Sequence, residues 1–174
     1  MKRNNEIFKE IVELDNYFRH SKKFFRFIED QDIGKYETQP YNLGGNAKFI
    51  MSFTEPISKE LQSRHSKVGH YLNQNYLIRL YEILKHYKIT GKNNINKSLK
   101  GSDEIEILWE LRKRFAHGLG KYDSTNSKDK ELLELLISRF GEKHIVKDEF
   151  PISQDKTIKE IIHGIKSYLY KESK

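Results

Sequence analysis

The chain has 174 residues, of which 33% are charged, 36% are hydrophobic and 12% are aromatic, and its formal net charge is +7. This length suits one well-buried domain, and the apolar residues are sufficient for its core. Since the sequence contains no cysteine, disulfides, thiolate metal ligands and cysteine nucleophiles are excluded.

The positive charge favours polyanionic partners such as nucleic acid, because lysine and arginine release counterions when they meet phosphates. A lysine-rich protein from an AT-rich genome would carry the same charge, so the charge alone does not select a function. No apolar run reaches the length of a signal peptide or the roughly 20 residues needed to span a bilayer. We therefore expect a cytoplasmic protein that does not enter a membrane.

Apolar positions at helical spacing predict a long amphipathic helix from about Asn5 to Asp30. The helical pattern then fails over Gln31–Pro56, where glycines and prolines recur, and we interpret this stretch, including its glycine-rich run at 41–46, as a long loop. A second helical region is predicted from about Ile57 to Tyr87, with a break or bend near Gly69.

The next helix is predicted within the stretch Asp103–Tyr122. Asp103 can accept hydrogen bonds from the amides of the first turn, and Glu106 occupies the position that a capping box requires. Gly118 stands where a left-handed residue closes a helix, so the helix should stop at His117. Its apolar residues form one stripe: Ile105, Leu108, Trp109, Leu111, Phe115 and Ala116.

Two more helices follow. A short one is predicted over Lys130–Phe140, ending at Gly141, and after an extended segment at His144–Pro151 a last helix begins near Ser153 or Asp155, either of which could cap it. The predicted fold is thus an all-α, single-domain helical bundle of about five helical segments over residues 1–174, with the second region and the 103–117 helix at its centre.

Arg112 and His117 are the strongest candidates for catalytic residues. Five helical positions separate them by about 140° of rotation and roughly 7.5 Å of rise, so the two side chains do not stack, but both could touch one phosphate. An imidazole can take a proton from a ribose hydroxyl while a guanidinium holds the charge that develops on the phosphoryl oxygens. Alternatively, Arg112 is a solvated helix residue and His117 stabilises the negative end of the helix dipole.

At these residues the chain resembles a known family. The run Leu111–Gly120, LRKRFAHGLG, is similar to the signature of the HEPN superfamily, in which an arginine precedes a histidine by four to six residues at the end of a core helix. The same spacing occurs at Arg139–His144 and Arg64–His70, but only the first pair ends in the Ala-His-Gly-x-Gly exit. The resemblance implies an all-α fold and a homodimer with one composite ribonuclease site, in which Arg112 and His117 are catalytic.

The resemblance also suggests roles for neighbouring residues and for partners. Lys113 and Arg114 would bind backbone phosphates, Lys121 would contact RNA, and Tyr122 would stack on a base. We expect no metal and no cofactor. The partners implied are RNA, a second copy of the chain and an antitoxin or regulatory protein, since members of the family act in phage defence and in toxin–antitoxin pairs.

Two other hypotheses remain open. Lys113 stands where many active family members carry Asn, Asp or His, so the chain could be a non-catalytic HEPN-like module that binds RNA or a protein. The third hypothesis is a helical accessory protein of a mobile element, whose basic surface binds DNA with a steep dependence on salt.

Overall fold

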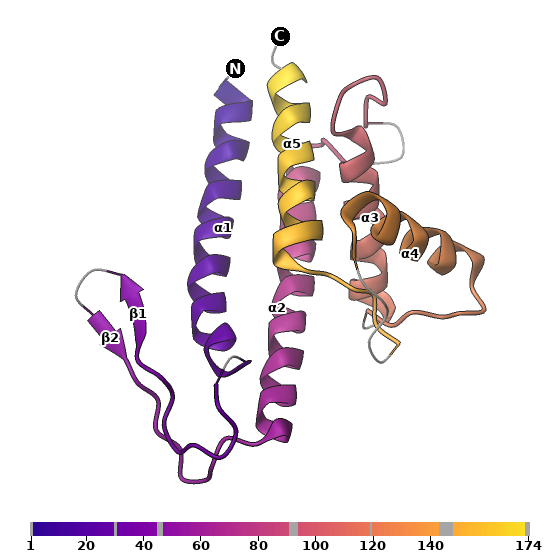
Figure 1. Cartoon of the computed structure of the whole chain (residues 1–174). Coiled ribbons are helices and arrows are strands. Elements are labelled where there is room, and N and C mark those ends of the chain that lie inside the picture. The colour runs from indigo at the N-terminus through magenta and orange to yellow at the C-terminus, as the bar shows by residue number, and fades with distance from the viewer. Residues whose placement is uncertain are drawn as a thin grey trace. The chain divides into compact units, whose positions relative to one another are not determined.

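The structure, a computed structural model, describes residues 2–29, 31–44, 47–90, 94–118, 120–142 and 148–172 (Figure 1). It confirms the predicted all-α class. The helices of the described residues are α1 (Lys2–Glu29), α2 (Lys59–His86), α3 (Ser102–Gly118), α4 (Ser127–Phe140) and α5 (Lys159–Glu172), with one π-helical turn, η1 (Gln154–Ile158), leading into α5. No helix among these residues is long and apolar enough to cross a membrane.

The chain groups into two compact units. The larger unit contains Met1–Leu14 and Asn73–Lys174, and the smaller unit contains Asp15–Leu72. Both α1 and α2 contain residues of both units. The expectation of one domain over residues 1–174 stays a prediction.

In the smaller unit, α2 is continuous through Gly69, so the predicted break there is wrong. One glycine inside a helix costs only about 1 kcal/mol relative to alanine, which the rest of a 28-residue helix easily outweighs. The Gly69 carbonyl also accepts a hydrogen bond of 3.2 Å from Lys22 Nζ of α1.

The prediction of a loop at 41–46 is also wrong. Tyr41–Gly44 forms β1, which pairs with β2 (Ala47–Phe49) in an antiparallel hairpin (Figure 1). Residues 45–46, between the strands, lie outside the described residues. Backbone pairing continues beyond the two strands, in the segments before β1 and after β2. There Thr38 N donates to Met51 O at 3.0 Å, and Phe53 N donates to Tyr36 O at 2.8 Å. Such pairing joins distant residues and leaves little trace in local periodicity.

In the larger unit, the most extensive contact between helices is that of α3 with α5. Gly101, the residue before α3, approaches α5 closely: it has a φ of 100°, and a Cβ on it would lie 2.7 Å from the Gly164 carbonyl carbon. The core contains the predicted apolar stripes and includes Ile7, Ile11, Leu77, Leu80, Leu84, Ile105, Leu108, Leu111, Phe115, Ile161, Ile165 and Leu169. Two residues of the predicted stripe of α3 are not in this core: Ala116 is exposed and Trp109 is half-buried.

The C-terminal helices begin at other residues than predicted. α4, which runs across the direction of α3 in Figure 1, starts at Ser127 and is capped by Asn126, whose side chain accepts from Lys128 N. Gly141, with a φ of 64°, closes α4 as predicted. Ser153 does not cap a helix through its side chain, because its hydroxyl donates instead to Glu142 Oε1 at 2.8 Å.

The alternative cap, Asp155, lies inside η1, and α5 begins only at Lys159. The buried Glu142 takes the capping role, since its Oε1 accepts from Thr157 N of η1 at 3.4 Å. The same oxygen also accepts from Ser153 N at 2.8 Å and from Thr157 Oγ1 at 2.5 Å. Of the predicted extended segment, residues 144–147 lie outside the described residues.

Candidate functional site

The end of α3 is shaped by Gly120. Gly118 is the last residue of the helix but does not have a positive φ, so the predicted left-handed closure at Gly118 is wrong. Gly120 has that conformation instead, with a φ of 72°, and its N–H donates to Arg114 O at 3.1 Å. A Cβ on Gly120 would lie 2.9 Å from Cδ of the buried Gln74, so the exit from α3 requires a glycine there.

Backbone hydrogen bonds tie this exit to residues 148–150. Tyr122 N donates to Asp148 O at 2.6 Å, Phe150 N donates to Gly120 O at 3.1 Å, and Lys121 forms an isolated bridge with Glu149. The Tyr122 ring meets Phe150 edge-on, with centroids 5.7 Å apart. The Lys121 side chain is exposed, whereas Tyr122, the predicted base-stacking residue, is half-buried.

His117 lies in the last turn of α3 and is exposed. Within the described part of the chain its imidazole makes no hydrogen bond or ion pair. A substrate could therefore reach both ring nitrogens without displacing a protein group.

Arg112 has a different environment. Its Nη2 forms an ion pair of 3.0 Å with Glu82 Oε1 of α2, and its guanidinium carbon lies 5.4 Å from the centroid of the Tyr81 ring. A quarter of its side chain is exposed, and its buried Nε has no hydrogen-bond partner. Among the described side chains, no hydrogen bond joins Arg112 to His117. A phosphate that binds Arg112 would compete with Glu82 for the guanidinium.

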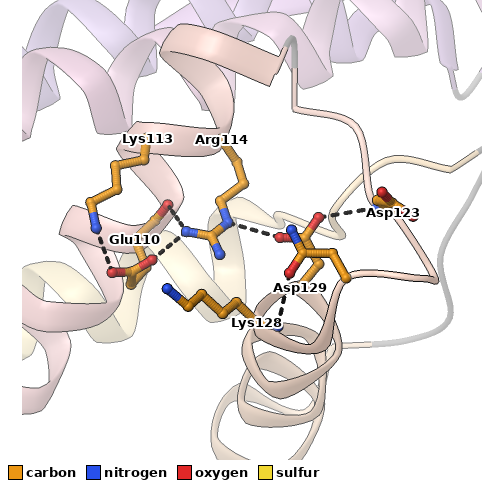
Figure 2. A network of polar contacts seen from close by, with 7 residues as sticks. Glu110, Lys113, Arg114, Asp123, Lys128 and Asp129 are labelled. Carbon is orange, nitrogen blue, oxygen red and sulfur yellow. Dashed lines mark hydrogen bonds and ion pairs between the residues drawn. The ribbon is translucent and has the colours of Figure 1, made fainter.

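Lys113 and Arg114 converge on Glu110, one turn earlier in α3 (Figure 2). Lys113 Nζ lies 2.7 Å from Glu110 Oε1 and 3.4 Å from the centroid of the Trp109 ring, and Arg114 Nη1 pairs with Glu110 Oε2. Partial burial on its own would raise the pKa of Glu110. The hydrogen bonds from Lys113 and Arg114 outweigh that effect and hold the pKa of Glu110 below its ordinary value.

Asp129 completes this network (Figure 2). Its Oδ1 lies 3.1 Å from Arg114 Nε, and its Oδ2 accepts from Asp123 N at 3.1 Å. Since Asp129 is buried and the Arg114 side chain is only 13% exposed, this ion pair fastens α3 to the first turn of α4 and to the loop between them. Arg114 is thus a structural cross-link, and phosphate binding by it stays a prediction.

The carboxylates that neutralise the motif were not part of the predicted site. Glu110 was detectable, because it stands three and four residues before Lys113 and Arg114, at spacings that bring helix side chains together. Glu82 and Asp129 come from α2 and α4, and no local spacing connects them to the motif.

The two other pairs with similar spacing are held differently. Arg139 binds Asp103 at 3.1 Å and Glu104 at 2.6 Å, while His144 lies outside the described residues. Arg64 pairs with Glu60 at 2.6 Å on the exposed surface of α2. Both arginines therefore contact carboxylates near the surface, and neither belongs to the exit of α3.

Among the described residues, no three His, Asp or Glu side chains lie close enough together to hold a metal ion. Comparison of the chain with family models, with curated proteins and with solved structures finds no match. Its function is therefore inferred from the residues at the exit of α3.

Proposed function

We propose that the protein is a metal-independent endoribonuclease of the HEPN type, acting as a homodimer. The observation that carries this proposal is His117, an exposed imidazole at the end of a helix whose apolar side is buried, with no competing partner in the described part of the chain. The exit of α3 is held by Gly120 and by the backbone hydrogen bonds to residues 148–150. The backbone next to His117 is therefore fixed in position.

The divergence of Arg112 and His117 supports a composite site. Arg112 faces Glu82 and Tyr81 of α2, and about 140° of helix rotation separates it from His117. Two copies of each residue, brought together across a twofold axis, would supply a histidine and an arginine to the same phosphate.

In the proposed reaction, one His117 removes the proton from a ribose 2′-hydroxyl, and the resulting oxygen attacks the adjacent phosphorus. The bond from phosphorus to the 5′-oxygen breaks, and a protonated His117 from the other copy donates a proton to that leaving oxygen. Arg112 stabilises the charge on the phosphoryl oxygens. The products are a 2′,3′-cyclic phosphate and a 5′-hydroxyl, and DNA, which lacks the 2′-hydroxyl, resists cleavage.

The proposed biological setting is phage defence or a toxin–antitoxin pair, on the resemblance of residues 111–120 to HEPN proteins. An antitoxin or regulatory protein would then be a further partner, and covering His117 would be sufficient to inhibit cleavage.

The test is cleavage of labelled single-stranded RNA and transfer RNA in EDTA by wild type, His117→Ala and His20→Ala. His20 is an exposed histidine of α1 in the smaller unit, so it is a matched control. We expect wild type and His20→Ala to leave cyclic phosphate ends, and His117→Ala to lose at least about a thousandfold in rate. Equal cleavage by all three proteins would refute the assignment.

A second candidate is a non-catalytic HEPN-like module that binds RNA or a protein. It is favoured by the pairing of three cations at the motif, since Arg112, Lys113 and Arg114 each contact a carboxylate. This candidate predicts that wild type binds RNA but leaves every RNA intact in the same assay, and that His117→Ala binds equally well.

A further inference from the structure

The connection between α2 and α3 contains basic residues and no acidic residue. From Ile83 to Ser102 the sequence contains no aspartate or glutamate. Three lysines of the connection lie in the described residues and are exposed, and we refer to them as the lysine surface: Lys88, Lys97 and Lys100.

These lysines are freer than the cations of the motif. In the described part of the chain, Lys88 and Lys100 have no carboxylate partner. Lys97 pairs with Glu106 at 2.9 Å, but its side chain remains 77% exposed. Exposed pairs of this kind contribute little, so a phosphate can replace the carboxylate at small cost.

Lys88 has a backbone conformation that lysine rarely adopts. Its φ is 56°, in the left-handed region that favours glycine and asparagine. Hydrogen bonds from Lys88 N to Lys85 O and from the buried Ile89 N to Leu84 O, both 2.9 Å, hold this turn after α2. A lysine at a position where glycine would relieve strain indicates a use for its side chain.

Lys97 and Lys100 project from a turn that is also fixed. Asn96 N donates to the hydroxyl of the buried Tyr168 at 2.9 Å, and the Asn96 side chain accepts from Ser98 N at 3.1 Å. Gly101 then packs against the backbone of α5 at Gly164. The lysines therefore extend from a preorganised backbone, which reduces the entropy lost on binding.

We propose that the lysine surface binds the phosphate backbone of RNA, at a place separate from His117. α3 has 17 residues, which places its two ends roughly 24 Å apart. That length corresponds to about seven phosphate steps along one strand of a duplex. Resting on the proposed ribonuclease function, this inference makes the substrate an RNA long enough to contact both ends of α3, such as a stem–loop.

The test measures the binding of a stem–loop RNA of about ten base pairs as a function of salt, in the His117→Ala background so that no cleavage interferes. Replacing the three lysines of the surface by alanine should lower affinity at least about tenfold at 0.15 M salt and reduce the slope of log K against log salt by about three. The control replaces three exposed lysines elsewhere: Lys9, Lys67 and Lys130.

An equal loss in the control variant overturns the proposal, because it would show that net charge alone is responsible. An unchanged slope in the lysine-surface variant also overturns it. Polyglutamate that binds as tightly, with the same dependence on these lysines, would overturn the assignment to RNA.

Lys88→Gly tests the surface without endangering the fold, since glycine suits a φ of 56°. We expect an equal or higher melting temperature together with a salt slope smaller by about one. A lower melting temperature or an unchanged slope contradicts the role given to Lys88.

The two proposals fail in different ways. With His117 intact, the variant that lacks the three lysines of the surface should cleave an RNA of about four nucleotides as fast as wild type does, because such an RNA is too short to reach both ends of α3. If wild type cleaves no RNA, the ribonuclease proposal fails while the salt slopes still decide the lysine surface. If cleavage occurs and the slopes agree, only the lysine surface is refuted.

Discussion

The two ends of α3 differ in how their cations are held. At the C-terminal end, Arg112, Lys113 and Arg114 each contact a carboxylate from α2, α3 or α4. In the connection that leads into the N-terminal end, Lys88 and Lys100 contact no carboxylate among the described side chains. Paired charges fix the structure around His117, and unpaired charges are available for a ligand, so a count of lysines and arginines does not show where phosphates bind.

The two ends also differ in what fixes the backbone. The connection is held by close packing at Gly101 and by the hydroxyl of the buried Tyr168. The motif end depends on ion pairs that include the buried Asp129. Packing is insensitive to pH and salt, whereas the contribution of ion pairs changes with both.

The largest expected loss of unfolding free energy comes from Gly101→Ala, which disrupts the close packing before the N-terminal end of α3. A Cβ on Gly101 would lie 2.7 Å from the Gly164 carbonyl carbon, and the φ of 100° is itself unfavourable for alanine. Backbone strain and overpacking together should cost about 3–5 kcal/mol of unfolding free energy. Chemical denaturation followed by circular dichroism measures this loss.

Gly34→Ala is the matched control for Gly101→Ala. Gly34 has a φ of 90°, but a Cβ on it would meet nothing within 4 Å. It should therefore cost only the strain, about 1–2 kcal/mol. Equal losses for the two variants would show that close packing at Gly101 does not hold the connection.

A smaller effect is expected from Asp129→Asn at the motif end. The variant removes the buried charge that Arg114 Nε contacts at 3.1 Å, while Glu110 continues to pair with Arg114. We expect a loss of about 1–3 kcal/mol in unfolding free energy. The salt slope of RNA binding, which depends on the lysine surface, should stay the same.

Glu134→Gln, which neutralises an exposed carboxylate of the same helix, serves as the control for Asp129→Asn. A denaturation midpoint for Asp129→Asn that matches this control would mean that the Arg114 pair contributes nothing. A change in the salt slope would mean that the two ends of α3 are not independent.

The features that could be predicted from the sequence are those that depend on local residue patterns. Most positions of the apolar stripes of α2, α3 and α5 are buried where periodicity placed them, because a repeat of 3.6 residues marks one face of a helix. Ala116, which is exposed, is an exception. Gly141 closes α4 for a similar reason, since its conformational freedom suits a helix end.

Features that join distant residues escaped the sequence analysis. The hairpin at 41–49 pairs strands through backbone groups that carry no residue signature, and Glu82 meets Arg112 only because α2 lies against α3. The left-handed residue after α3 is Gly120 and not Gly118, because the backbone of residues 148–150 and the side chain of Gln74 determine where the chain turns. Whether Arg112 and His117 act on RNA stays a prediction.

The smallest expected effect is a pH dependence at the motif end. Because the pKa of Glu110 in the folded protein lies below its ordinary value of 4.5, the unfolded chain binds the proton more readily. The contribution of Glu110 is therefore complete above pH 4.5 and is lost as the pH falls through the folded pKa. A third of the side chain is exposed, so solvent screening keeps this contribution small. Unfolding free energies of wild type and Glu110→Gln should differ most near neutral pH, and the difference should shrink as the solution is acidified below the ordinary pKa of 4.5. A difference that grows on acidification would contradict the assigned direction of the pKa shift.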